Sequence, residues 1–94
     1  MSMLDTVATK IIREQELVIG PLAWSEAAKV AGMRVDPARR GVTISNGDPK
    51  ATVDRLVGQY ERLFGRASQE VCKEAAASLI TSLAKTEVPV SLLA

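Results

Sequence analysis

The chain contains no histidine, one cysteine, and one each of tryptophan, tyrosine and phenylalanine among its 94 residues. Without histidine, a serine or cysteine nucleophile lacks its usual general base, and a Ser-His-Asp triad cannot form. One cysteine supplies neither an intramolecular disulfide nor the several thiolate or imidazole ligands of a zinc site. The sequence therefore predicts no metal, no cofactor and no catalytic residue, and we expect a protein that is not an enzyme.

Glycine motifs, apolar runs and net charge exclude further classes of function. Neither a Gly-x-Gly-x-x-Gly segment nor a P-loop signature occurs, so no nucleotide cradle is specified. No apolar run reaches the roughly 18 residues that a membrane span requires. The 12 basic and 11 acidic residues give a formal charge of +1, which argues against a chain built mainly to bind nucleic acid. Residues 1–9 lack the basic leader and apolar run of a secretory signal, so we expect a cytoplasmic location.

Two consecutive amphipathic stripes between residues 48 and 83 form the strongest pattern in the chain. Asp48 is suited to cap a helix and Pro49 to occupy its first position. Gly65 is predicted to separate this helix from the next, which Ser68 is expected to cap. Both stripes have apolar residues three and four positions apart, as on one helix face. They are Val53, Leu56, Val57, Tyr60, Leu63 and Phe64, then Val71, Cys72, Ala75, Ala76, Leu79, Ile80 and Leu83.

The first third of the chain predicts two more helices. Gly20-Pro21 interrupts a stripe of apolar residues, because proline lacks an amide hydrogen and disfavours helical geometry in the residue before it. A second, short helix is predicted over residues 21–31, with Gly32 as its stop. One long helix kinked at Gly20-Pro21 is an alternative that the sequence leaves open. The first apolar face consists of Leu4, Val7, Ala8, Ile11, Ile12, Val18 and Ile19.

Residues 33–36 and 42–45 alternate apolar and polar side chains with the period of a half-buried strand. The five residues between them have the length and composition of a hairpin loop. The predicted fold is therefore mainly α with a small β-hairpin at about residues 33–45, in the order α-α-β-β-α-α. We expect a compact single domain over residues 1–85, followed by an apolar extended tail over residues 86–94, whose degree of order is left open.

The apolar stripe of the last helix is longer than the other elements can cover, which favours an interaction surface. Self-association as a homodimer is favoured over a monomer, with another protein as a further expected partner. We thus predict a cytoplasmic protein-interaction or regulatory module. Its candidate interface residues are Leu79, Ile80, Leu83, Val88, Val90, Leu92 and Leu93.

Two alternative functions remain. Arg34, Arg39 and Arg40 cluster on or near the hairpin and are candidate phosphate contacts of a small nucleic-acid-binding regulator. No aromatic residues are interleaved with them to stack bases, so a solvated turn is the simpler interpretation. A carrier of an apolar small ligand would use the aromatic residues as pocket walls; these are Trp24, Tyr60 and Phe64. Cys72 lies within an apolar stripe and is interpreted as a buried core residue rather than a reactive thiol.

Overall fold

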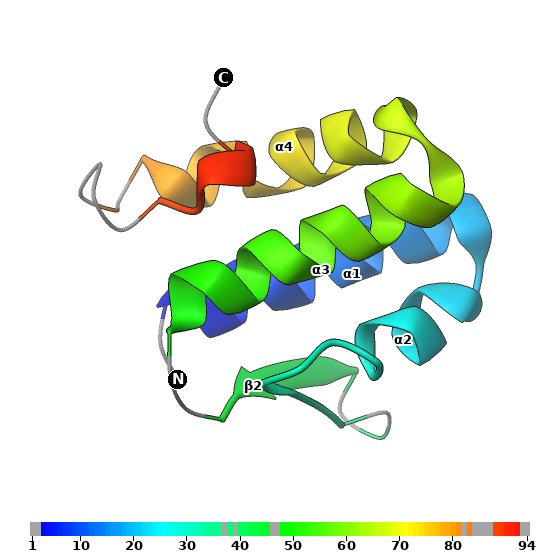
Figure 1. Cartoon of the computed structure of the whole chain (residues 1–94), viewed down its shortest axis with the longest axis horizontal. Coiled ribbons are helices and arrows are strands. Elements are labelled where there is room, and N and C mark those ends of the chain that lie inside the picture. Colours follow the sequence, from blue (N-terminus) through cyan, green and yellow to red (C-terminus); the bar gives the residue numbers. More distant parts are fainter. Residues whose placement is uncertain are drawn as a thin grey trace.

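Helices dominate the computed structural model, and a two-stranded antiparallel hairpin lies between them in the sequence (Figure 1). The structure describes residues 3–36, 38, 40–45, 48–81, 83 and 88–92. The elements are α1 (Met3–Ile19), α2 (Leu22–Ala27), β1 (Met33–Asp36), β2 (Gly41–Ile44), α3 (Pro49–Phe64), α4 (Arg66–Ile80) and the 3-10 turn η2 (Val90–Leu92). The predicted class, mainly helical with a small hairpin in a single globule, is confirmed.

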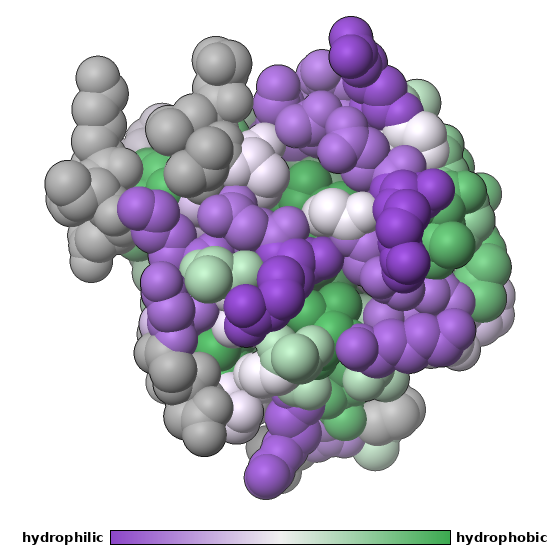
Figure 2. Space-filling model, in the orientation of Figure 1, coloured by the Kyte–Doolittle hydropathy of each residue, from purple (hydrophilic) through white to green (hydrophobic). Residues whose placement is uncertain are grey.

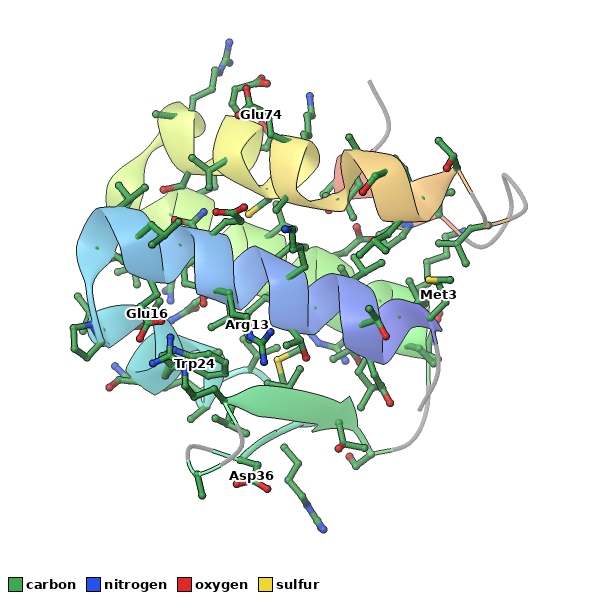
Figure 3. All side chains as sticks on the ribbon, turned by 180° about the vertical axis from the view of Figure 1, so that it is seen from behind. Met3, Arg13, Glu16, Trp24, Asp36 and Glu74 are labelled. Carbon is green, nitrogen blue, oxygen red and sulfur yellow. The ribbon has the colours of Figure 1, made fainter. Side chains whose placement is uncertain are left out.

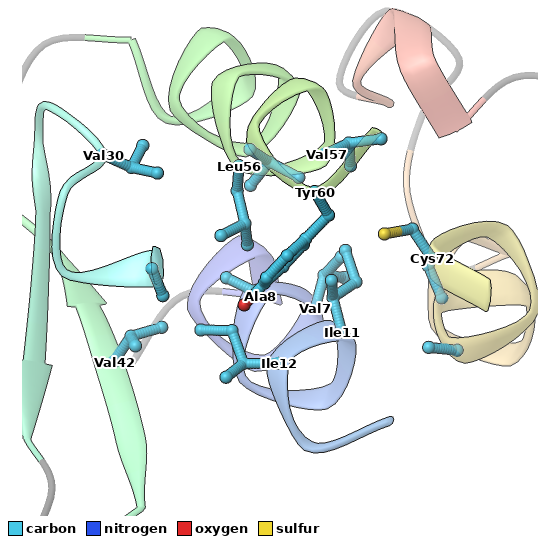
Figure 4. Packing of buried hydrophobic residues seen from close by; sticks show 14 of the residues in the cluster. Val7, Ala8, Ile11, Ile12, Val30, Val42, Leu56, Val57, Tyr60 and Cys72 are labelled. Carbon is cyan, nitrogen blue, oxygen red and sulfur yellow. The ribbon is translucent and has the colours of Figure 1, made fainter. Parts of the chain in front are cut away.

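Helix α1 contacts each of α2, α3, α4 and β2 and so lies at the centre of the fold. In Figure 1, α4 and η2 form the top layer, α3 lies in front of α1 in the middle, and α2 and the hairpin lie below. A single core joins these layers (Figure 4). Its buried side chains include Val7, Ile11, Ile12, Val42, Leu56, Val57, Tyr60 and Cys72.

Three helix boundaries lie where the sequence predicts them. The Asp48 carboxylate caps α3 by accepting hydrogen bonds from the backbone amides of Lys50 and Ala51, at 3.1 and 3.3 Å. Gly65 separates α3 from α4 with φ +87°, in the left-handed region that favours glycine. Gly20 has φ +74°. The chain therefore breaks between α1 and α2 and does not continue as one kinked helix.

Three other boundaries differ from the prediction. The second helix ends at Ala27, because the chain then tightens into turns that lead to Gly32, whose φ is +86°. Ser68 does not cap α4, since that helix already begins at Arg66 and Ser68 is buried inside it. Helix α4 ends at Ile80, and Leu83 belongs to a turn in which its amide donates to the Ile80 carbonyl oxygen at 3.0 Å.

Helix α1 also covers one edge of the hairpin. Three side chains of α1 form hydrogen bonds with backbone groups of residues 40–44. The helix residues are four positions apart in the sequence, and the residues they contact are two positions apart. Four helical residues rise about 6.0 Å and two strand residues span about 6.8 Å, so the two spacings nearly match. We call these contacts the α1–β2 ladder. Its pairs are Asp5 Oδ1 with the Ile44 amide (3.0 Å), Thr9 Oγ1 with the Val42 amide (3.2 Å) and Arg13 Nη2 with the Arg40 carbonyl oxygen (3.1 Å).

The register of the hairpin explains why these backbone groups are available. Val35 lies opposite Val42 and Arg34 lies opposite Thr43. In an antiparallel pair, alternate residues turn their backbone groups toward and away from the partner strand. The Val42 amide faces α1, so the backbone groups of Val35 opposite it face away from β2. Helix α1 therefore satisfies amides that would otherwise form an open sheet edge.

The described part of the predicted tail docks on α3 and α4. Val88 and Leu92 are only 5% and 3% exposed. The Ser91 amide and hydroxyl both donate to the Asp54 carboxylate, at 2.9 and 2.7 Å. The segment predicted to be extended therefore contains a 3-10 turn over Val90–Leu92 and adds apolar side chains to the core.

Candidate functional site: an exposed apolar end of the helices

The residues predicted as the association surface lie largely against the core of the chain itself. Those at the end of α4 and in the turn after it are half-buried and pack on the core: Leu79, Ile80 and Leu83. Those of the tail that can be placed are buried: Val88 and Leu92. The Val90 side chain and Leu93 lie outside the described residues. Much of the apolar stripe of α4 that the sequence predicts to be unpartnered is therefore covered by α1 and η2.

Exposed apolar side chains gather at a different place. Leu17 and Val18, in the last turn of α1, are 81% and 67% exposed, and Leu22 and Leu63 are about half exposed. Helices α1 and α3 run in the same direction, so their last turns lie at the same end of the molecule, beside the start of α2 (Figure 1). Figure 2 shows apolar surface at this end, on the right of the view. We call Leu17, Val18, Leu22 and Leu63 the apolar end.

A buried glutamine lies on the face of α1 where the sequence pattern predicts apolar residues, whereas Val18 on the same face is exposed. Val18 is predicted on the buried face of α1, whereas Gln15 takes a wholly buried position one turn earlier. The Gln15 side-chain amide donates to the Ser68 carbonyl oxygen at 2.9 Å and to Cys72 Sγ at 3.3 Å, both on α4. These bonds satisfy the N–H donors of the amide, whereas its carbonyl oxygen Oε1 is buried with no hydrogen-bond partner among the described residues. Polarity alone does not predict this arrangement, because the partners lie far along the chain.

A hollow of about 420 Å³ lies between α1 and α4 beside the apolar end. Leu17, Val18, Val71 and Ala75 form its apolar wall, and the carboxylate-bearing side chains of Glu14 and Glu74 complete the lining. We call it the α1–α4 hollow. Leu17 therefore lies next to a depression that is large enough to accept an apolar side chain of similar size.

The predicted phosphate contacts do not assemble into one basic surface within the described part of the chain. Arg40 ion-pairs with Glu16 and lies over the Trp24 ring, with its guanidinium carbon 5.8 Å from the ring centroid, a cation–π geometry (Figure 3). Arg34 is exposed on β1, and Arg39 lies outside the described residues. The Arg40 guanidinium is thus directed toward α1 and α2 rather than toward a shared surface with Arg34.

The three aromatic residues do not line a common pocket among the hollows described here. Tyr60 is wholly buried, and its hydroxyl donates to the Ala23 carbonyl oxygen at 2.7 Å. Burial raises the pKa of the Tyr60 hydroxyl above its ordinary value. Trp24 and Phe64 are half-buried at other places in the fold. Their arrangement gives no support to an apolar-ligand carrier.

Cys72 is a wholly buried core residue, as predicted. Burial raises the pKa of its thiol to about 11, although the hydrogen bond from Gln15 acts in the opposite direction. A reactive thiol needs both access and a stabilised thiolate. Cys72 has neither, because its side chain faces α1 and α3 in the core (Figure 4).

Within the described ranges of the chain, no three potential ligands among Cys, Asp and Glu come together as a metal site. No helix in those ranges combines the length and apolar character needed to cross a membrane. Comparisons with protein-family models, curated proteins and solved structures find no match to this chain. The apolar end and the α1–α4 hollow are the features of the described chain that suit contact with another protein.

Proposed function

We propose that this chain is a non-enzymatic cytoplasmic protein-interaction module that associates with a second copy of itself through the apolar end. The observation that carries the proposal is the exposure of Leu17 at 81% and Val18 at 67%. The half-exposed Leu22 and Leu63 lie at the same end of the molecule (Figure 1). Exposed apolar side chains that gather at one end of a small domain are typical of interaction sites. Amphipathic helices remain the associating elements, as the sequence predicts, but at the end of α1 instead of the end of α4.

A second copy is the favoured partner because the surface is self-complementary. Leu17 protrudes next to the α1–α4 hollow, whose wall it shares with Val71 and Ala75. In a twofold dimer the same patch meets itself, so Leu17 of each copy enters the hollow of the other. Glu14 is already paired with Lys10 at 3.6 Å, so part of the acidic rim is neutralised.

The size of the apolar end predicts weak association. Burying its four side chains in both copies contributes roughly 10 kcal/mol, at about 1.5–3 kcal/mol for each fully exposed large apolar side chain. The loss of translational and rotational freedom opposes this by at least about 4 kcal/mol. At most about 6 kcal/mol remains, which corresponds to a dissociation constant between about 10 μM and 1 mM.

Sedimentation equilibrium across this concentration range tests the proposal. The wild-type chain is expected to shift from monomer to dimer, and Leu17→Lys is expected to remain monomeric because it places a charge in the apolar contact. Lysine is compatible with the last turn of a helix, so the fold is retained. Met3→Lys is the matched control, since Met3 is an exposed apolar residue at the other end of α1.

Two outcomes contradict the proposal. A wild-type chain that is monomeric up to about 1 mM has no self-association of this strength. A dimer that withstands Leu17→Lys but is dissociated by Leu83→Asp uses the stripe predicted from the sequence.

The nucleic-acid alternative has less support, because the Arg40 guanidinium is held by Glu16 and Trp24.

A further inference from the structure

A second hollow, of about 350 Å³, lies on the other side of the fold between the outer face of α3 and the turns that follow α2. Figure 2 looks onto this side of α3, where strongly hydrophilic side chains gather. Two arginines and a lysine belong to its lining. We call it the basic hollow; its principal residues are Lys29, Ala31, Arg55, Gly58, Gln59 and Arg62.

The two guanidinium groups in the basic hollow bond only to neutral groups in the described part of the chain. Arg55 donates to the Ala31 carbonyl oxygen at 3.4 Å and to the Thr52 hydroxyl at 3.2 Å. Arg62 donates to the side-chain oxygen of Gln59 at 2.7 Å. Each guanidinium carries five N–H donors, so most of its donors stay available to a ligand.

The neighbouring carboxylate is already engaged. Glu26 accepts hydrogen bonds from Lys29 at 3.0 Å and from Gln59 at 2.8 Å, and these bonds hold its pKa below the ordinary value. The ion pair of Glu26 is with Lys29, so Arg55 and Arg62 form no ion pair with a described carboxylate, although the charge of Arg62 also helps to lower the pKa of Glu26. Planar guanidinium groups bind phosphate oxygens in bidentate geometry, so the two arginines favour a phosphate-bearing ligand.

Gly58 lies between the two arginines on the exposed face of α3. A glycine inside a helix is less favourable than an alanine, so its presence calls for a local reason. Packing gives none, because a Cβ built at Gly58 meets nothing within 4 Å. Its φ is also not in the left-handed region. A flat floor between Arg55 and Arg62 does serve one purpose, since it lets a ligand approach the helix backbone closely.

We propose that the basic hollow binds a small phosphorylated ligand, with its phosphate oxygens between Arg55 and Arg62 and above Gly58. The two arginines are seven residues apart, about 10.5 Å along the helix axis. The Arg62 guanidinium folds back toward Gly58 and bonds to Gln59. The Arg55 guanidinium lies beside Thr52 and Ala31 at the other end of the hollow, and Lys29 belongs to the opposite wall. One open hollow lined by three cations fits one or two phosphoryl groups. A nucleic-acid strand would instead need a basic groove that continues along the surface.

Calorimetric titration of the full chain with inorganic pyrophosphate, at low ionic strength, tests this inference. The wild type is expected to bind, and Arg55→Gln with Arg62→Gln to lose affinity by about tenfold or more. The matched control is Lys10→Gln with Arg66→Gln, which removes the same charge at exposed positions elsewhere. This control pair is expected to keep the wild-type affinity within about twofold.

Gly58→Ala separates binding from folding. The added methyl group favours the helix and meets no neighbour, so the melting temperature is expected to rise. The same methyl group occupies the floor of the basic hollow, so affinity for pyrophosphate is expected to fall. An affinity that is unchanged in Gly58→Ala overturns the proposed close approach.

Three further results overturn the proposal. The first is a wild-type chain that shows no heat of binding with pyrophosphate up to about 1 mM. The second is an equal loss of affinity in the control pair, which would indicate a general charge effect. The third is tighter binding of a single-stranded oligonucleotide through Arg55 and Arg62, with affinity that increases with strand length, which would make the hollow part of a nucleic-acid surface.

Discussion

Replacing Thr9 by valine tests the α1–β2 ladder with almost no change in shape. The substitution exchanges the hydroxyl that accepts from the Val42 amide, at 3.2 Å, for a methyl group. Val42 is only 2% exposed, so its amide has little access to water in place of Thr9. An unsatisfied buried donor costs about 1–3 kcal/mol. Because Thr9 itself is half-buried, we expect the lower end, a loss of about 1 kcal/mol in the free energy of unfolding.

Urea unfolding followed by circular dichroism measures this loss. For a chain of this size, about 1 kcal/mol moves the midpoint down by about 0.5–1 M urea. Thr43→Val is the matched control on β2: Thr43 is exposed, and its side chain takes no part in the ladder. The control is expected to change stability by less than about 0.5 kcal/mol.

Hydrogen exchange at the Val42 amide gives a second, local measurement. Losing about 1 kcal/mol of protection accelerates exchange about fivefold where opening is in equilibrium. Equal urea midpoints for Thr9→Val and Thr43→Val, together with unchanged exchange at Val42, would refute the ladder as a stabilising contact.

Two further predictions concern the start of α3 and the buried thiol. Asp48→Ala is expected to cost about 0.5–2 kcal/mol, because two helix amides lose their acceptor; an unchanged urea midpoint would contradict the cap. Since burial raises the pKa of Cys72 from 9.0 to about 11, the folded chain keeps its thiol proton between these pH values while the unfolded chain loses it, so stability falls as pH rises from 9 to 11. Urea unfolding at pH 8 and pH 10.5 measures this loss of stability, which Cys72→Ala is expected to reduce. An equal loss of unfolding free energy between the two pH values in both proteins would contradict the raised pKa of Cys72.

Local signals in the sequence were sufficient to predict most of the fold. Asp48-Pro49, Gly65 and Gly20 each impose a backbone geometry or supply an acceptor within a few residues, so their effects are readable without knowing the tertiary structure. The hairpin follows from period-two alternation for the same reason. The end of α4 was predicted less well, because Leu83 continues the apolar pattern of Leu79 and Ile80 after the helix has stopped at Ile80.

The candidate sites depend on contacts that sequence spacing does not contain. Gln15 takes a buried position because acceptors on α4 lie within reach, and Val18 is exposed because it lines the α1–α4 hollow in the last turn of α1. The basic hollow joins Lys29 to Arg55 and Arg62 across the fold. One signal for the basic hollow was present in the sequence, because Gly58 interrupts a segment that otherwise has a helical pattern. A glycine inside a helix without a packing reason directs attention to the helix face around it.

Covering β2 with α1 also limits how the hairpin can pair with other strands. An isolated hairpin has two open edges, and repeated pairing at both would extend a sheet through many molecules. Here the ladder occupies the β2 edge, so β1 offers the remaining edge, on which Val35 turns its backbone groups outward. With one open edge in the described part of the hairpin, strand pairing alone joins two chains and does not extend a sheet further.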